Sequence, residues 1–125
     1  MNIELKSIDK IKTFNPDKNY ALYNVYIELT ETPDQIWMEI FKIIWSQIWY
    51  SMKRKAWIEN NYLIIHSPLD EIEKYHIQFL KKAIELTNKE RNEQDKRNQI
   101  NQERQKQEKI DEDKEKDKYL GKLKL

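Results

Sequence analysis

The chain has 125 residues, a formal net charge of +1 at pH 7, no cysteine and a single glycine, Gly121. The balanced charge argues against the basic surface by which proteins usually bind duplex nucleic acid. The absence of cysteine excludes disulfides, thiolate nucleophiles and zinc sites built on sulfur, and the scarcity of glycine argues against phosphate-binding loops and nucleophile elbows. We therefore expect a protein that is not an enzyme and holds no cofactor or metal.

The chain opens with the pattern of a strand. Residues 2–8 alternate between apolar and polar side chains, with Ile3 and Leu5 on one face. Residues 9–18 contain Pro16 and several charged side chains, which predicts a loop.

Residues 20–29 show the clearest strand pattern, because every second residue from Ala21 to Leu29 is apolar. The opposite face of this strand carries Tyr20, Leu22 and Tyr26. Such a face is unusually aromatic for one that water would cover, so we expect it to contact something else.

The stretch from Thr32 to Lys55 has the most concentrated apolar content and predicts a long helix. Thr32 can cap it, Pro33 suits its first position and Gln35 completes a capping box. A central apolar stripe should face the core, and it consists of Trp37, Ile40, Phe41, Ile44 and Ile48. The narrow polar strip consists of Gln35, Glu39, Lys42, Ser46 and Lys53.

Apolar residues also flank the central stripe, so that the apolar arc covers more than half of the predicted helix. A surface helix needs an arc of only about 100°. The flank formed by Met38, Trp45, Trp49 and Met52 therefore predicts contact with a protein partner or a second copy of the chain. A helix wrapped more deeply by its own domain is the alternative.

The predicted helix closes on three cations, Lys53, Arg54 and Lys55. Cations in a last turn complement the helix dipole, which explains them without any ligand. The alternative is that they bind nucleic acid.

Residues 56–66 predict a β-hairpin that turns at Asn60 and Asn61, two residues that tolerate positive φ. This register pairs Glu59 with Tyr62 and Trp57 with Ile64. The core face is then Ala56, Ile58, Leu63 and Ile65, and the opposite face is Trp57, Glu59, Tyr62, Ile64 and His66.

Ser67, Pro68 and Asp70 predict the start of a second helix, whose buried stripe includes Ile72, His76 and Phe79. From Lys89 to Lys118 almost every side chain is charged or carries an amide, which predicts a frayed extension of that helix or disorder. The apolar end, Tyr119, Leu120, Leu123 and Leu125, is typical of a short linear motif or of a sticky disordered terminus.

These elements predict an α+β fold: a two-layer sandwich whose antiparallel sheet of about four strands, in ββαββα order, has two helices on one face. Residues 1–88 should form the compact domain. Residues 89–125 should form a charged helical or disordered extension with an apolar end.

The N-terminus lacks the basic and apolar regions of a secretion signal, and no apolar run approaches the roughly 20 residues of a spanning helix. We therefore expect a cytoplasmic protein without membrane contact. Its richness in Lys, Asn, Ile and Glu suggests an AT-rich bacterial or phage source.

The two predicted hairpins place several aromatic residues on one sheet face if they join. That face would hold Tyr20, Leu22, Tyr26, Trp57, Tyr62, Ile64 and His66. A protein partner could cover it, or single-stranded nucleic acid could stack on it beside Lys53–Lys55. Because Glu4, Glu28 and Glu59 lie nearby, we favour a non-catalytic protein-interaction module, such as a small subunit, adaptor or inhibitor.

Overall fold

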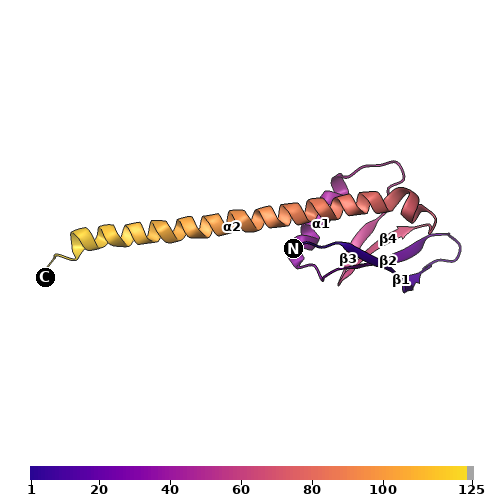
Figure 1. The fold of residues 1–125 in the computed structure, drawn as a ribbon, viewed down its shortest axis with the longest axis horizontal. Helices are drawn as coiled ribbons and strands as arrows, with labels where there is room; N and C mark the ends of the chain where they lie inside the picture. Colours follow the sequence, from indigo (N-terminus) through magenta and orange to yellow (C-terminus); the bar gives the residue numbers. More distant parts are fainter. Residues whose placement is uncertain (124–125) are drawn as a thin grey trace. The chain divides into compact units, whose positions relative to one another are not determined.

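The structure, a computed structural model, describes residues 1–123 and has an α+β fold. The element order is β1 (Leu5–Phe14), β2 (Tyr23–Leu29), α1 (Gln35–Gln47), β3 (Ala56–Glu59), β4 (Tyr62–Ser67), the π-helical segment η1 (Ile72–His76) and α2 (Ile77–Leu120) (Figure 1). The ββαββα order is therefore confirmed. Leu125, which we assigned to the apolar end, lies outside the described residues.

The chain divides into two compact units, Met1–Arg91 and Asn92–Leu125. All four strands and α1 belong to the first unit, whereas the second contains the later turns of α2. The predicted domain boundary after residue 88 stays a prediction.

The four strands form one antiparallel sheet in the order β1-β2-β4-β3. The β3–β4 hairpin has the predicted register, with Glu59 opposite Tyr62 and Trp57 opposite Ile64. Of the two turn residues, Asn60 has a positive φ of 53°, whereas Asn61 does not, so the turn lacks the two positive φ angles of type I′. The strand order leaves β3 at one edge of the sheet.

Strand β1 is longer than predicted, because it continues through Phe14 where we expected a loop from residue 9. Its pairing with β2 is interrupted between Asp9 and Phe14. The Asp9 carboxylate accepts hydrogen bonds from the backbone N–H groups of Ile11 and Lys12, and the Thr13 hydroxyl accepts one from Tyr26 N–H. These side-chain bonds hold a bulge beside β2, and no alternation in the sequence reveals them.

Strand β2 begins at Tyr23, three residues later than predicted. Tyr20 instead lies in a turn, in which its N–H bonds to Asp17 O and its own carbonyl accepts from Asn15 Nδ2. Tyr20 is consequently 64% exposed. Tyr20 and Leu22 therefore precede the strand, and their assignment to the aromatic face of β2 is wrong.

Helix α1 is much shorter than the predicted span from Thr32 to Lys55. Asp34 caps it, since its Oδ1 accepts from Trp37 N at 2.8 Å, and Thr32 lies outside. The helix ends at Gln47, and Ile48 is extended. The Lys53 amine turns back to the carbonyls of Trp45 and Ile48, which satisfies acceptors that a continuing helix would have used.

The core of Met1–Arg91 combines one face of the sheet with side chains from both helices. A ladder of aromatic rings runs along α1, with ring centroids 5.7 Å apart for Trp37 and Phe41 and 6.3 Å apart for Phe41 and Trp45. The sheet and α2 add Val25, Ile27, Leu29, Leu63, Ile65, Leu80, Ala83 and Ile84. The predicted core faces are thus buried from Val25 to Leu29 on β2 and at Leu63 and Ile65 on β4, whereas Ala21 precedes β2 and is exposed.

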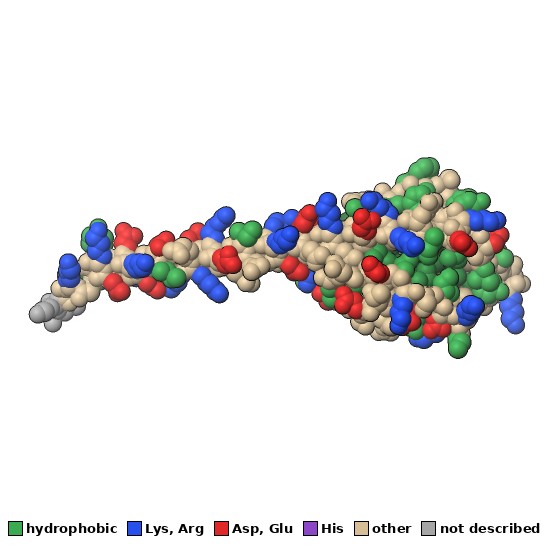
Figure 2. All heavy atoms as spheres, in the orientation of Figure 1, with side chains coloured by type: hydrophobic (Ala, Val, Ile, Leu, Met, Phe, Trp, Pro, Cys, Tyr) green, Lys and Arg blue, Asp and Glu red, His purple; other side chains and the backbone are tan. Residues whose placement is uncertain are grey.

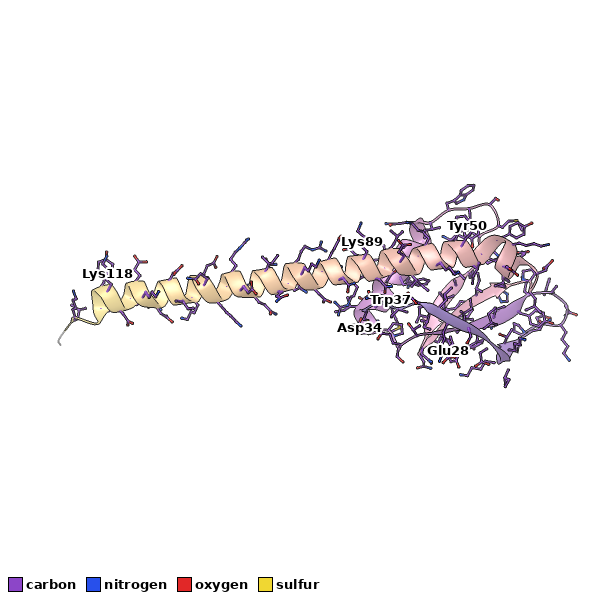
Figure 3. The ribbon with its side chains drawn as sticks, in the orientation of Figure 1. Glu28, Asp34, Trp37, Tyr50, Lys89 and Lys118 are labelled. Atoms are coloured by element: carbon purple, nitrogen blue, oxygen red, sulfur yellow. The ribbon has the colours of Figure 1, made fainter. Side chains whose placement is uncertain are left out.

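Asn88 joins the N-terminal segment, α1 and α2. Its Oδ1 accepts from Ile3 N at 3.1 Å and from Trp37 Nε1 at 2.9 Å, and its Nδ2 donates to Ile3 O at 2.8 Å. Arg91 donates to the Asp34 carboxylate at 3.0 Å, and this hydrogen bond holds the pKa of Asp34 below its ordinary value of 3.8. Figure 3 labels Asp34 and Trp37. The side chains that stabilise the first unit therefore extend along α2 as far as Arg91.

In the second unit, the helix reaches Leu120 and exposes nearly all of its side chains. Acidic and basic groups are interspersed along it (Figure 2). Lys109 pairs with Asp113 and Lys116 with Glu112, each across four residues. Such pairs stabilise a solvated helix by about 0.2 to 0.5 kcal/mol each.

Candidate partner-binding groove

An open groove of about 1050 Å³ lies along α1, the loop after it and β3. Its apolar lining comes from Met38, Phe41, Trp45, Trp49, Tyr50, Ala56, Trp57 and Ile58. Its polar rim comes from Gln35, Glu39, Lys42 and Ser46, which is most of the polar strip seen in the sequence, together with Ser51 and Lys53–Lys55. The groove joins the predicted helix flank to the predicted basic cluster and to Trp57 of the hairpin.

The two tryptophans of the predicted flank have opposite environments. Trp45 is 6% exposed and belongs to the core, although one side of it lines the groove. Trp49 is 82% exposed and lies in the loop after α1, not on the helix as we expected. The early end of α1 separates them, because residues beyond Ile48 no longer follow the helical spacing.

The two methionines of that flank are also separated. Met38 is partly buried and lines the groove on α1. Met52 is exposed in the loop and is not among the lining residues. The predicted strip therefore contributes Met38, Trp45 and Trp49 to one surface, and Met52 lies apart from them.

The three cations of the predicted basic cluster have different surroundings. The Lys53 amine donates to backbone carbonyls and lies 5.0 Å from the centre of the Trp45 ring, and burial lowers its pKa. Arg54 donates two hydrogen bonds to the Glu71 carboxylate, at 3.1 and 3.2 Å. Lys55 is exposed. Two of the three side chains therefore stabilise the loop that forms the groove wall.

A buried hydrogen-bond network also stabilises this loop. The Tyr50 hydroxyl lies 2.7 Å from His76 Nδ1, and His76 Nε2 lies 3.1 Å from Glu71 Oε1. An ionised carboxylate only accepts, so in the neutral ring Nε2 carries the proton and Nδ1 accepts from Tyr50. The Tyr50 ring also stacks on Phe79, with centroids 4.0 Å apart. Tyr50 is labelled in Figure 3.

The pKa values of two side chains in this network are shifted. Hydrogen bonds from Arg54 hold the pKa of Glu71 below its ordinary value of 4.5, and burial raises the pKa of Tyr50 to about 12. His76 is fully buried. Its position on an apolar helical stripe correctly predicted a packed histidine, but nothing in the sequence linked it to Tyr50 and Glu71.

The opposite face of the sheet carries a second, smaller cluster. Ile64 is fully buried there, between Tyr26 and Trp57 on the neighbouring strands. Tyr62 packs edge-on against Tyr26, at 5.6 Å between centroids, and its hydroxyl donates to Asp9 at 2.9 Å. The Asp9 bond raises the pKa of Tyr62 above its ordinary value of 10.0.

Two further side chains complete this cluster. The Lys12 amine lies 4.5 Å from the centre of the Tyr62 ring. His66, on the same face, pairs through Nδ1 with Asn24 Oδ1 at 2.7 Å. The bulge in β1 and the Lys12 side chain thus occupy part of the face that we expected to be open.

Within residues 1–123, no group of three or more histidine, aspartate and glutamate side chains is arranged to hold a metal ion. The helices described in that range include none with the length and apolarity that crossing a membrane requires. The groove combines apolar side chains with a polar rim that includes Lys42, Lys53, Arg54 and Lys55. Compared with known proteins, the chain matches no protein-family model, no curated protein and no solved structure.

Proposed function

We propose that this protein is a non-catalytic protein-interaction module that binds its partner in the groove between α1 and β3. In this proposal, residues 1–91 form two layers, with the sheet behind and both helices in front, and the charged helix is an extension. The protein then acts as a small subunit, adaptor or inhibitor in the cytoplasm.

The observation that carries this proposal is the exposure of Trp49 at the groove. An indole that is 82% exposed contributes little to folding, whereas tryptophan is among the residues most enriched at the centres of interfaces. Trp57 and Met38, which are both partly exposed, line the same groove and extend the apolar surface around it. A contiguous apolar patch of this kind marks an interaction site more often than single exposed apolar residues do.

Site-specific photocrosslinking tests the proposal. A benzophenone side chain at position 49 should crosslink to a protein in extracts of the source cells, and Tyr20 is the matched control because it is exposed outside the groove. Trp49→Ala should weaken capture of that partner by about 2 kcal/mol, the scale of a hot-spot aromatic, while Tyr20→Ala leaves it unchanged. A monomer that crosslinks to nothing from position 49, or equally from both positions, contradicts the proposal.

The second candidate function is binding of single-stranded nucleic acid. Lys12 and the rings of Tyr26 and Tyr62 are the observation in its favour, since cations and aromatic rings together can hold stacked bases. Asp9, Glu28 and Glu59 around these rings weaken it. Binding of an oligonucleotide that is strong at low salt and falls as salt rises would support it, and no binding at low salt would remove it.

A further inference from the structure

We infer that the groove takes an extended, acidic segment of a partner protein, which adds to the free edge of β3 as a fifth strand. This inference rests on the proposed function and specifies the conformation and the charge of the bound segment. Three features support it: the backbone of β3, the length of the groove and the charge of its rim.

The hairpin register determines which backbone groups of β3 point outward. In an antiparallel pair, hydrogen-bonded and non-hydrogen-bonded residue pairs alternate. Glu59 and Tyr62 flank the two-residue turn and form a bonded pair, and at the other end His66 N donates to Lys55 O at 3.0 Å. Ala56 and Ile58 fall on the alternate positions, so their N–H and C=O groups face away from β4. These are the groups that an added strand would bind.

The groove matches an extended strand in length. Its lining on α1 runs from Gln35 to Ser46, and eleven steps of a helix at 1.5 Å span roughly 16 Å. Five residues of a strand cover about the same distance. Alternate side chains of the segment would then face Met38, which is partly exposed, above the buried rings of Phe41 and Trp45.

The charge of the rim selects an acidic segment. Lys42, Lys53, Arg54 and Lys55 line the groove; Glu39 is the carboxylate among the lining residues, and Glu71 neutralises Arg54. Lys42 and Lys55 are exposed and can pair with a ligand without breaking an internal bond of Lys53 or Arg54. A second copy of the chain fits less well, because a symmetric dimer through this edge would bring two copies of the same cationic rim together.

Peptide selection tests the chemistry of the segment. The probes are peptides about 12 residues long, selected from a random library on the full chain. Enriched sequences should alternate apolar residues and carry Asp or Glu. Replacing both Lys42 and Lys55 with Glu should weaken their binding at least about fivefold, whereas Lys10→Glu with Lys18→Glu, two exposed sites outside the groove, should change it little. Enrichment of basic peptides would overturn the inference.

N-methylation of the selected peptide tests the added strand without altering the protein. Methyl groups on one alternate set of amides should weaken binding about tenfold or more, and those on the other set should have little effect, because only one edge of the peptide faces β3. Binding that depends on Trp49 but is unaffected by methylation of either set of amides would overturn strand addition and leave the proposed function intact. Selected peptides that bind Trp49→Ala and Tyr20→Ala alike would overturn both, and a concentration-dependent dimer that Ala56→Pro abolishes would assign the groove to a second copy.

Discussion

Trp45 and Trp49 are four residues apart in the sequence, yet one is interior and the other is exposed. Trp45 stacks on Phe41, meets Tyr50 edge-on at 6.0 Å between ring centroids, and has a lysine amine over its ring. Trp49 follows the end of α1 and stands at the groove. The difference shows that the end of a helix, more than its apolar pattern, decides which aromatic residues remain available to a partner.

Replacing each of these tryptophans with alanine should produce the largest difference in unfolding free energy, because one is interior and the other exposed. Trp45→Ala should lower the free energy of unfolding by about 3 to 5 kcal/mol, because it leaves a cavity among packed rings. Trp49→Ala should change it by less than about 0.5 kcal/mol. Urea unfolding followed by circular dichroism measures both. Equal losses would show that Trp49 is interior and would remove the basis of the proposed site.

The next largest effect on stability should come from Asn88, which bonds to Trp37 near the start of α1. Asn88→Ala should cost about 2 to 3 kcal/mol of unfolding free energy, because it orphans the Trp37 indole N–H and the backbone groups of Ile3. Lys89→Ala, an exposed neighbour, is the control. Should Asn88→Ala prove as stable as the control, the packing of α2 on α1 and the N-terminal segment would be incorrect.

The network behind the groove wall should respond to acid. The pKa of Glu71 is lower in the folded chain than its ordinary value of 4.5, so its stabilising contribution is present above that pH and is lost as pH falls through the folded pKa. Glu71→Gln should cost about 1 to 2 kcal/mol at neutral pH and should reduce the loss of stability on acidification. Urea unfolding at several pH values tests this, with Glu73→Gln as the exposed control. An unchanged acid profile in Glu71→Gln would contradict it.

The smallest expected effect is that of removing the second unit. Deleting residues 92–125 should change the unfolding free energy of the remainder by less than about 1 kcal/mol, since little apolar area is lost. Deleting residues 88–125 should cost more, because Asn88 and Arg91 are then missing. Thermal melts compare the two truncations. If the shorter deletion lowers the melting temperature by ten degrees or more, the second unit stabilises the first.

Side-chain alternation was enough to predict the hairpin register and most of the core faces of β2 and β4, and with helical spacing and capping residues it predicted the element order. These patterns failed where a side chain bonds to the backbone and interrupts a regular element. Lys53 binds carbonyls at the end of α1, and Asp9 and Thr13 hold the bulge of β1, so the predicted helix was too long and the first strand too short. Of the site, the sequence indicated Met38, Trp45, Trp49, Trp57 and the basic cluster. It gave no sign of the β3 edge, because strand order depends on the whole sheet.

Amide hydrogen exchange at β3 tests the central claim most directly. Without ligand, the N–H groups of Ala56 and Ile58 should exchange faster than that of Trp57, which pairs with β4. Saturation with a selected acidic peptide should slow exchange at Ala56 and Ile58 by at least about tenfold and change Trp57 much less. A bound peptide that leaves Ala56 and Ile58 exchanging as before would contradict strand addition at this groove.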